Sequence, residues 1–287
     1  MTMHRCASMA KAGQSKGPCR SNSKVKDKMN GTSFSLSGVG FDIDGRTLLH
    51  PLTLDVPKGE VVGILGHNGS GKSTLLKILA RFQAPTRGRA DYRGQPLTSF
   101  RPKDYARKVA YLPQQTPDTD GMTVREVVSL GRYPWHGALG RFSLTDRTKV
   151  SEALDLTGLT PFADRIVDTL SGGERQRAFL AMLIAQDTEC LLLDEPISAL
   201  DINHQIEVMS LIRMLAHEHD RSVLIVLHDI NMAARFCDRL IALSGGRLVA
   251  HDATDALITA DKLNAIYGVR MGIFRHPETQ SPISYVL

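Results

Sequence analysis

The feature that most constrains the fold is the stretch Val61–Arg81, VVGILGHNGSGKSTLLKILAR. It begins with a β-branched apolar run typical of a buried strand, breaks into GHNGSGKS, and ends with apolar residues at helical spacing. Strand, glycine-rich turn and helix are the context that a phosphate-binding loop requires. Gly66, Gly69 and Gly71 let successive backbone N–H groups converge on one anion, beside the positive end of the following helix. The stretch therefore predicts a nucleotide site.

Two side chains of this stretch carry the expected chemistry. Lys72 would place its ammonium against the β- and γ-phosphates, and the Ser73 hydroxyl would bind the Mg²⁺ that bridges them. The alternative is an ordinary glycine turn followed by an unrelated lysine, and the fitting strand and helix argue against it. The predicted phosphate-loop residues are Gly66, His67, Asn68, Gly69, Ser70, Gly71, Lys72, Ser73 and Thr74.

The net charge of +5 suggests nucleic acid as a partner until it is mapped along the chain. Residues 1–31 hold seven Lys and Arg against Asp27 alone, a charge of +6, which leaves −1 for residues 32–287. We predict a disordered basic tail over 1–31, a folded domain over 32–287, and no nucleic-acid binding. The tail is interpreted as dispensable, or as upstream of a true start at Met29; attraction to anionic lipid is the alternative.

The cysteines show neither C-x-x-C spacing nor partner histidines, so a zinc site is not expected. Cys190 lies in an apolar run and Cys237 in a predicted helix, which indicates buried thiols in a reducing compartment. The other two are Cys6 and Cys19. The sequence has no apolar run of the ~18 residues that a membrane-spanning helix needs, so we expect a cytosolic or peripheral protein.

Strands and helices alternate along the rest of the chain. Strands are expected at FSLSGVGFDI, LTLDVP, KVAYLP, CLLLDE and VLIVLHD, and helices at LSGGERQRAFLAMLIAQD, IEVMSLIRMLAHEH and NMAARFCDRL. Turns are expected at Gly45-Arg46, within TRGRADYRGQPL and at Gly245-Gly246. The order predicts an α/β fold with a mainly parallel core sheet and an antiparallel β subdomain. A more polar helical stretch predicts a helical subdomain over roughly 116–170.

The segment CLLLDEP is the second nucleotide element. Its apolar run predicts a central strand, and Asp194 stands at the carboxyl end, where open α/β sheets bind ligands. Asp194 would hold the magnesium ion, and Glu195 would face the γ-phosphate and polarise the attacking water. An ordinary acidic strand end is the alternative, which the earlier phosphate loop makes the weaker one.

The segment LSGGERQR is the third element. Ser171 with Glu174 three residues later forms a capping box, so a helix begins here. Two glycines inside the first helical turn each cost ~1 kcal/mol of helix stability. Bare N–H groups at a positive helix end suggest a second anion site. Because the loop at Lys72 already holds phosphates, we infer that this site completes the nucleotide pocket of another copy across a dimer.

GHNGSGKST, LSGGERQR, LLLDEP, SALD and LHD, in this order, resemble the ATP-binding cassette family of transport ATPases over residues 34–250. The resemblance implies that Gly66–Thr74 is the Walker A loop and that Gln114 is the Q-loop glutamine, which senses magnesium and the membrane partner. It also implies ATP and Mg²⁺ as cofactors.

The same resemblance assigns roles to the remaining motifs. Ser171, Gly172 and Gly173 resemble the signature that caps the γ-phosphate of the opposite subunit. Asp194 and Glu195 resemble the Walker B aspartate and the catalytic glutamate. Residues 198–201, ending in Asp201, resemble the D-loop that communicates across the dimer. His228 resembles the switch histidine that contacts the γ-phosphate.

Two positions depart from the family pattern. Ile43 stands where the family usually stacks adenine on an aromatic ring, so an apolar contact must serve instead. Ile197 replaces the usual threonine of DEPTSALD and should not touch the chemistry, because the neighbouring carboxylates keep their places.

GRYPWHGALGRF, VAYLPQQ and VLHDINMAARFCD are similar to the iron-chelate and cobalamin importers, and within them to the ferric hydroxamate uptake ATPases. The aromatic residues Tyr133, Trp135 and Phe142 either form the core of the helical subdomain or line a groove that receives a permease. The resemblance implies a homodimeric ATPase on the cytoplasmic face of a bacterial inner membrane, working with permease subunits and, indirectly, a periplasmic siderophore-binding protein. Haem or cobalamin is the alternative cargo, and a soluble, non-transport ATPase is the rival function.

Overall fold

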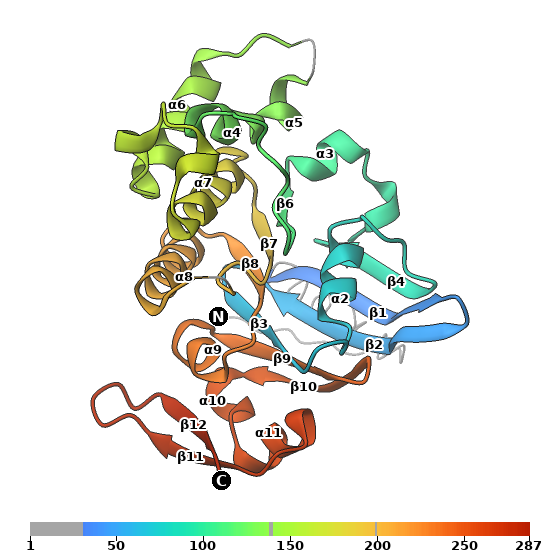
Figure 1. Cartoon of the computed structure of the whole chain (residues 1–287). Helices are drawn as coiled ribbons and strands as arrows, with labels where there is room; N and C mark the ends of the chain where they lie inside the picture. Colours follow the sequence, from blue (N-terminus) through green and yellow to red (C-terminus); the bar gives the residue numbers. More distant parts are fainter. Residues whose placement is uncertain (1–30, 138–139, 199) are drawn as a thin grey trace, which may run out of the picture.

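The computed structural model describes residues 31–137, 140–198 and 200–287. The predicted tail lies, apart from Gly31, outside the described residues, as do Cys6 and Cys19. Figure 1 shows a sheet in the middle of the molecule, a group of helices at one end and the C-terminal elements at the other.

A six-stranded sheet forms the centre, in the order β10-β9-β3-β8-β7-β6. All neighbours are parallel except β10, which pairs antiparallel with β9 at the edge. The strands are β3 (Val61–Leu65), β6 (Val109–Leu112), β7 (Cys190–Asp194), β8 (Ser222–Val226), β9 (Arg239–Ser244) and β10 (Arg247–Ala253). Every residue of β3, β7 and β8 is buried, which explains their continuous apolar sequences.

Alternate residues of these strands point into two separate cores. Along β3, Val61 and Leu65 belong to one hydrophobic cluster, whereas Val62 and Ile64 belong to the other. The first cluster packs beneath the long helices α7 (Gly172–Ala185) and α8 (Ile202–His217), and the second beneath α2 (Lys72–Leu79). The two-residue period of a strand therefore builds both layers from one sequence.

The second core is closed by a four-stranded antiparallel sheet in the order β2-β1-β4-β5. Its strands are β1 (Thr32–Ile43), β2 (Arg46–Pro57), β4 (Arg87–Tyr92) and β5 (Gln95–Pro96). The expected hairpins at Gly45-Arg46, at Gly245-Gly246 and within TRGRADYRGQPL are all present. The predicted α/β fold, with a mainly parallel sheet and an antiparallel β part, is confirmed.

Helices α4, α5, α6 and α7 gather at the upper end of Figure 1. Their bounds, with the short α3 beside them, are α3 (Pro102–Ala106), α4 (Val124–Leu130), α5 (Tyr133–His136) and α6 (Leu144–Leu156). Capping boxes start α4 at Thr123, α6 at Ser143 and α7 at Ser171, so the start predicted from Ser171 and Glu174 is confirmed. Three 3-10 turns cover Leu97–Ser99, Thr160–Phe162 and Val167–Thr169. The helical subdomain boundary of 116–170 stays a prediction.

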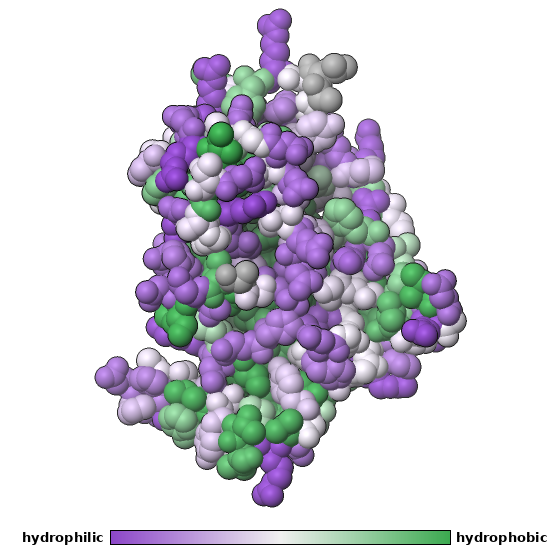
Figure 2. All heavy atoms as spheres, in the orientation of Figure 1, coloured by the Kyte–Doolittle hydropathy of each residue, from purple (hydrophilic) through white to green (hydrophobic). Residues whose placement is uncertain are grey.

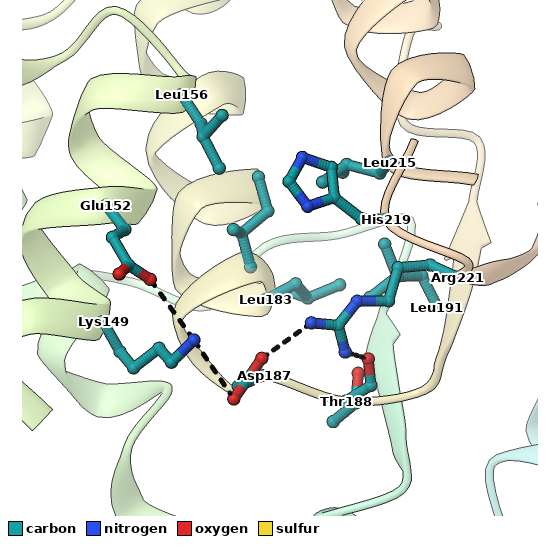
Figure 3. A pocket seen from close by; sticks show the side chains of 11 residues that line it. Lys149, Glu152, Leu156, Leu183, Asp187, Thr188, Leu191, Leu215, His219 and Arg221 are labelled. Carbon is teal, nitrogen blue, oxygen red and sulfur yellow. Dashed lines mark hydrogen bonds and ion pairs between the residues drawn. The ribbon is translucent and has the colours of Figure 1, made fainter. Parts of the chain in front are cut away.

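A small cavity of about 80 Å³ lies between α6, α7 and α8, where the helices meet the core (Figure 3). Asp187, just after α7, accepts from Arg221 Nη2 at 2.7 Å and lies 3.4 Å from Lys149 Nζ of α6. Burial by itself would raise the pKa of Asp187, but Arg221 and Lys149 outweigh it and lower that pKa. One carboxylate therefore ties α6 to the chain between α8 and β8.

One expected helix is too long. The sequence predicts a helix over NMAARFCDRL, but α9 (Ile230–Phe236) ends before Cys237, whose backbone is extended (φ −97°, ψ 141°), and Arg239 already begins β9. The short apolar run fits either structure, and pairing of β9 with β3 decides it. Cys237 is buried, as is Cys190, and both are free thiols, as expected.

Four elements follow the core without having been predicted. They are α10 (Thr254–Leu257), α11 (Ala260–Tyr267), β11 (Met271–Arg275) and β12 (Pro282–Val286), and the last two form a separate hairpin. Figure 2 shows apolar side chains gathered at this end of a mostly hydrophilic face. Over the described parts of the chain, no helix has both the length and the apolar character needed to cross a bilayer.

Candidate ATP-binding site

The phosphate loop runs from the end of β3 to the start of α2, as predicted. Gly66 has φ +150°, and a Cβ there would stand 2.2 Å from the carbonyl oxygen of Leu243 in β9. Any side chain at this position would therefore push the loop away from the sheet. Gly71 has φ +95° and caps α2, so that the helix begins at Lys72.

The Lys72 side chain lies inside the loop. Its Nζ donates to the carbonyl oxygens of Gly66 at 2.9 Å and His67 at 3.0 Å. Burial lowers the pKa of Lys72, and the carboxylates of Glu195 and Asp194 partly oppose that shift. A buried ammonium with a third N–H to donate is suited to hold an anion at the loop.

Asp194 ends β7 next to α2, and its carboxylate is buried. The Ser73 hydroxyl donates to Asp194 Oδ1 at 3.0 Å, and the Tyr111 hydroxyl lies 3.5 Å from Oδ2. Burial raises the pKa of Asp194, the Ser73 bond lowers it, and the charge of Glu195 raises it further. A buried carboxylate beside a hydroxyl, with a raised pKa, gains from a divalent cation, so Ser73 and Asp194 fit a magnesium ion.

The carboxylate of Glu195 contacts residues from two other motifs. Gln114 Nε2 donates to Glu195 Oε2 at 2.8 Å, and His228 Nε2 lies 2.6 Å from Oε1. Glu195 has φ +54°, which is a strained backbone for a residue with a side chain. This backbone conformation at the end of β7 directs the carboxylate toward Gln114, which follows β6, and His228, which follows β8.

A pocket of about 380 Å³ lies over these groups. The described residues that line it are Leu48, Asn68, Gly69, Ser70, Gly71, Lys72, Ser73, Thr74, Gln114, Glu195 and His228. All but Leu48 were predicted from the sequence. Ile43, expected to contact the base, is 45% exposed and outside the pocket, whereas Leu48 of β2 forms its apolar wall. The pairing of Phe41 with Leu49 sets this register, which the sequence pattern did not reveal.

The signature residues and Asp201 lie outside this pocket. Ser171 caps α7, and its hydroxyl accepts from the Glu174 N–H at 3.3 Å. Asp201 caps α8, and its Oδ1 accepts from the His204 N–H at 3.0 Å and lies 2.8 Å from His204 Nδ1. One copy of the chain thus brings together the Walker motifs, Gln114 and His228, whereas its signature residues and Asp201 lie outside that pocket.

The two signature glycines differ in their surroundings. A Cβ on Gly173 would stand 2.6 Å from the His204 ring, which Asp201 holds in place, whereas a Cβ on Gly172 would meet no described atom within 4 Å beyond its own helical turn. We expect Gly173→Ala to lower the free energy of unfolding by about 1–3 kcal/mol through overpacking. Gly172→Ala is expected to leave it no lower and to raise it by up to ~1 kcal/mol, because alanine favours a helix more than glycine does. Denaturant unfolding of both variants would measure this contrast.

The ATPase rate of the two variants distinguishes a role in packing within one chain from a role at the nucleotide of a second copy. Gly172→Ala should lower ATP hydrolysis without any loss of stability if Gly172 faces a nucleotide held by a partner chain. Equal stability losses in the two variants would contradict the packing account, and full activity of Gly172→Ala would contradict the partner account.

The phosphate loop, the two carboxylates at the end of β7 and the strand order define a P-loop nucleotide-binding domain. The profile of the ABC transporter family matches residues 49–198. The chain is 40% identical over 237 residues (83% of this chain, 88% of the relative) to the ferric enterobactin transport ATP-binding protein FepC of Escherichia coli (strain K12). It is 38% identical over 255 residues (89% and 94%) to the iron(3+)-hydroxamate import ATP-binding protein FhuC of Bacillus subtilis (strain 168).

The chain belongs to the ABC transporter family, and it is an ATP-binding subunit with ATPase activity. Among solved structures, a metal-chelate type ABC transporter in an inward-facing conformation superposes with a TM-score of 0.78 at 26% identity, covering 90% of this chain and 97% of that one. A dimeric bacterial ABC transporter cassette superposes with a TM-score of 0.68 at 29% identity, covering 77% and 98%.

Proposed function

We propose that this chain is the ATP-hydrolysing subunit of an importer for iron(III)-hydroxamate siderophores across the bacterial inner membrane. The observation that carries the hydrolytic part is that Lys72, Ser73 and Glu195 line one pocket, and that the buried Asp194 accepts a hydrogen bond from Ser73. Magnesium, when bound at Ser73 and Asp194, would neutralise phosphate charge. Gln114 lines the same pocket, and its predicted role as a further magnesium ligand is part of this proposal.

Glu195 is the proposed general base. Both of its carboxylate oxygens are engaged, one by Gln114 and the other by His228. A carboxylate can accept a proton from water only when an oxygen lone pair faces that water. Each oxygen of Glu195 has one partner and keeps a second lone pair, which can face the attacking water, and release of His228 would free that ring to contact the γ-phosphate. This pairing links hydrolysis to the position of two different loops.

The proposed partner in hydrolysis is a second copy, arranged head to tail. Ser171, Gly172 and Gly173 of one copy would cap the ATP held by Lys72 of the other, with Asp201 beside the same interface. The open surroundings of Gly172 support this arrangement, because nothing within the described chain requires its glycine. The positive end of α7 suits the γ-phosphate.

A groove of about 370 Å³ is the proposed docking site for a permease. Phe82, which is 72% exposed, lines it with Tyr105 and Tyr111. The aromatic residues singled out earlier do not line this groove themselves. Tyr133 is 56% exposed, and Trp135 donates from Nε1 to the carbonyl oxygen of Gln186, a lining residue, at 2.7 Å. Phe142 is 38% exposed, so none of the three is buried in the helical core as the first alternative required. Exposed aromatics beside a groove are typical of protein interfaces.

Several relatives support an iron–siderophore cargo without separating the chelates. Proteins named for transport of enterobactin, hydroxamates and petrobactin are 40%, 38% and 40% identical, and a cobalamin import ATP-binding protein of Halobacterium salinarum is 36% identical. The hydroxamate choice therefore rests on the resemblance of GRYPWHGALGRF and its flanks. Binding-protein dependence and a location on the cytoplasmic face of the membrane are part of the same proposal.

Uptake of radio-iron ferrichrome tests this function. In cells that lack the chain, wild type is expected to restore uptake, whereas Lys72→Ala should leave it at background because the phosphates lose their buried cation. The same cells supplied with ferric enterobactin, haem and cobalamin provide matched cargoes. Ferrichrome uptake that persists without the chain would overturn the hydroxamate assignment, and the cargo whose uptake is lost would replace it.

A further inference from the structure

The C-terminal segment, residues 254–287, contacts α9 and approaches the phosphate loop, two features that the function above does not use. It follows the six-stranded sheet and packs back against it through α11, whose Leu263 and Ile266 are buried in the first core. Its hairpin β11–β12 lies beside α9 in Figure 1, and β12 contacts α9 directly. α9 begins two residues after His228.

The first contact is between Asn231 in α9 and Ser284 in β12. Asn231 Nδ2 donates to the Ser284 carbonyl oxygen at 3.2 Å, while the Ser284 N–H donates to Asn231 Oδ1 at 2.8 Å. The Ser284 hydroxyl also donates to Oδ1 at 3.0 Å. The amide thus pairs with both backbone groups of one residue, as a neighbouring strand would, and fixes the first turn of α9 on β12.

The second contact is at Tyr267, the last residue of α11. The Tyr267 hydroxyl is buried beside the backbone of Gly66 and the carboxylate of Asp229, and it completes no hydrogen bond with a described residue. Burial raises the pKa of Tyr267 to about 12, the Gly66 backbone lowers it, and the charge of Asp229 raises it. Asp229 caps α9 by accepting from the Met232 N–H at 2.8 Å. The Tyr267 hydroxyl therefore lies close enough to the Gly66 backbone and to Asp229 for both to influence its pKa.

We propose that Asn231 is a positioning residue for ATP hydrolysis, through which the C-terminal segment holds α9 and so sets His228 against Glu195. His228 lies in the connection between β8 and α9, and its Nε2 is 2.6 Å from Glu195 Oε1. A side chain held at that distance is sensitive to small shifts of the helix that follows it. The proposal rests on the proposed role of His228, and it is independent of the cargo.

ATPase kinetics of the full-length chain test the proposal. Asn231→Ala is expected to lower kcat about 5- to 10-fold with KM for ATP within about twofold, because it removes the hydrogen bonds that hold α9 and leaves the phosphate loop unchanged. Ser284→Ala, which keeps both backbone bonds to Asn231, should lose less. Asn264→Ala is the matched control, since Asn264 is exposed on α11 and its side chain bonds to none of the described residues.

A double-mutant cycle distinguishes positioning from a general loss of structure. If Asn231 acts through His228, the double variant Asn231→Ala/His228→Ala should be no slower than His228→Ala alone. Additive losses, or a wild-type kcat in Asn231→Ala, would overturn the proposal. Ferrichrome uptake takes no part in this test, so a failure of the cargo assignment would appear only in the uptake experiment.

Discussion

Replacing Glu195 with glutamine is expected to lower the rate of ATP hydrolysis by ~100-fold or more while ATP is still bound. General-base groups contribute rate factors of about 10²–10⁴. The amide keeps the size of the side chain but cannot accept a proton. Lys72, Ser73 and Asp194, which hold the phosphates and the cation in our proposal, keep their contacts. Single-turnover hydrolysis and equilibrium binding of ATP measure the two effects separately.

The same variant reports on the dimer. A chain that binds ATP and does not hydrolyse it should accumulate as an ATP-bound dimer, which sedimentation velocity detects. Glu218→Gln is the control for the loss of one negative charge, because Glu218 lies at the far end of α8 and outside the pocket. Hydrolysis at the wild-type rate by Glu195→Gln would contradict the assignment of Glu195 as the general base.

Replacing Asp146 with alanine is expected to destabilise the chain by about 3–5 kcal/mol, the typical cost of leaving a buried charge without its partner. Asp146 Oδ1 accepts from Arg132 Nε at 2.8 Å, and both side chains are only 5% exposed. Arg132 also donates to the carbonyl oxygen of Ala185, so this ion pair joins three helices. Thermal unfolding should show a fall of roughly 10 °C in Tm.

An exposed ion pair provides the control. In the pair between Arg125 and Asp164 the side chains are 51% and 86% exposed, so Asp164→Ala should cost less than about 1 kcal/mol. Equal losses in the two variants would contradict the role of burial.

The ion pair of Asp146 also predicts a pH dependence. Burial by itself would raise the pKa of Asp146, but Ser143 and Arg132 outweigh it and hold that pKa at about 2. Because the folded pKa lies below the ordinary value of 3.8, the stabilisation is complete above about pH 5 and is lost progressively as the pH falls toward 2. The stability gap between wild type and Asp146→Ala should therefore narrow across that range.

The phosphate loop and the helix cap could be predicted from the sequence because each depends only on residues a few positions apart. The glycines and lysine of Gly66–Lys72 need only their own spacing to form a phosphate loop, and Ser171 with Glu174 caps its own helix. Asp194 was placed from the apolar run before it, which forms β7 as predicted. The magnesium and hydrolysis roles of these residues stay predictions until the variants above are measured.

Other parts depended on contacts between distant segments. Leu48 enters the pocket wall because strand register sets which residues of β2 face the loop, and Ile43 consequently lies outside it. The local pattern predicts a helix that continues through Cys237 to Leu240. Pairing of β9 with β3 makes Arg239 and Leu240 part of a strand instead, so α9 ends at Phe236 and Cys237 is not helical.

The sequence alone determined the strand–loop–helix of the phosphate site, the carboxylates after β7 and the helix start at Ser171, since each depends on residues a few positions apart. Only the tertiary structure decided that Gln114 and His228 share the two oxygens of Glu195, and that Asn231 is held by Ser284. These pairs lie tens of residues apart in the chain. Their distances are set by strand order and helix packing, which no local pattern encodes.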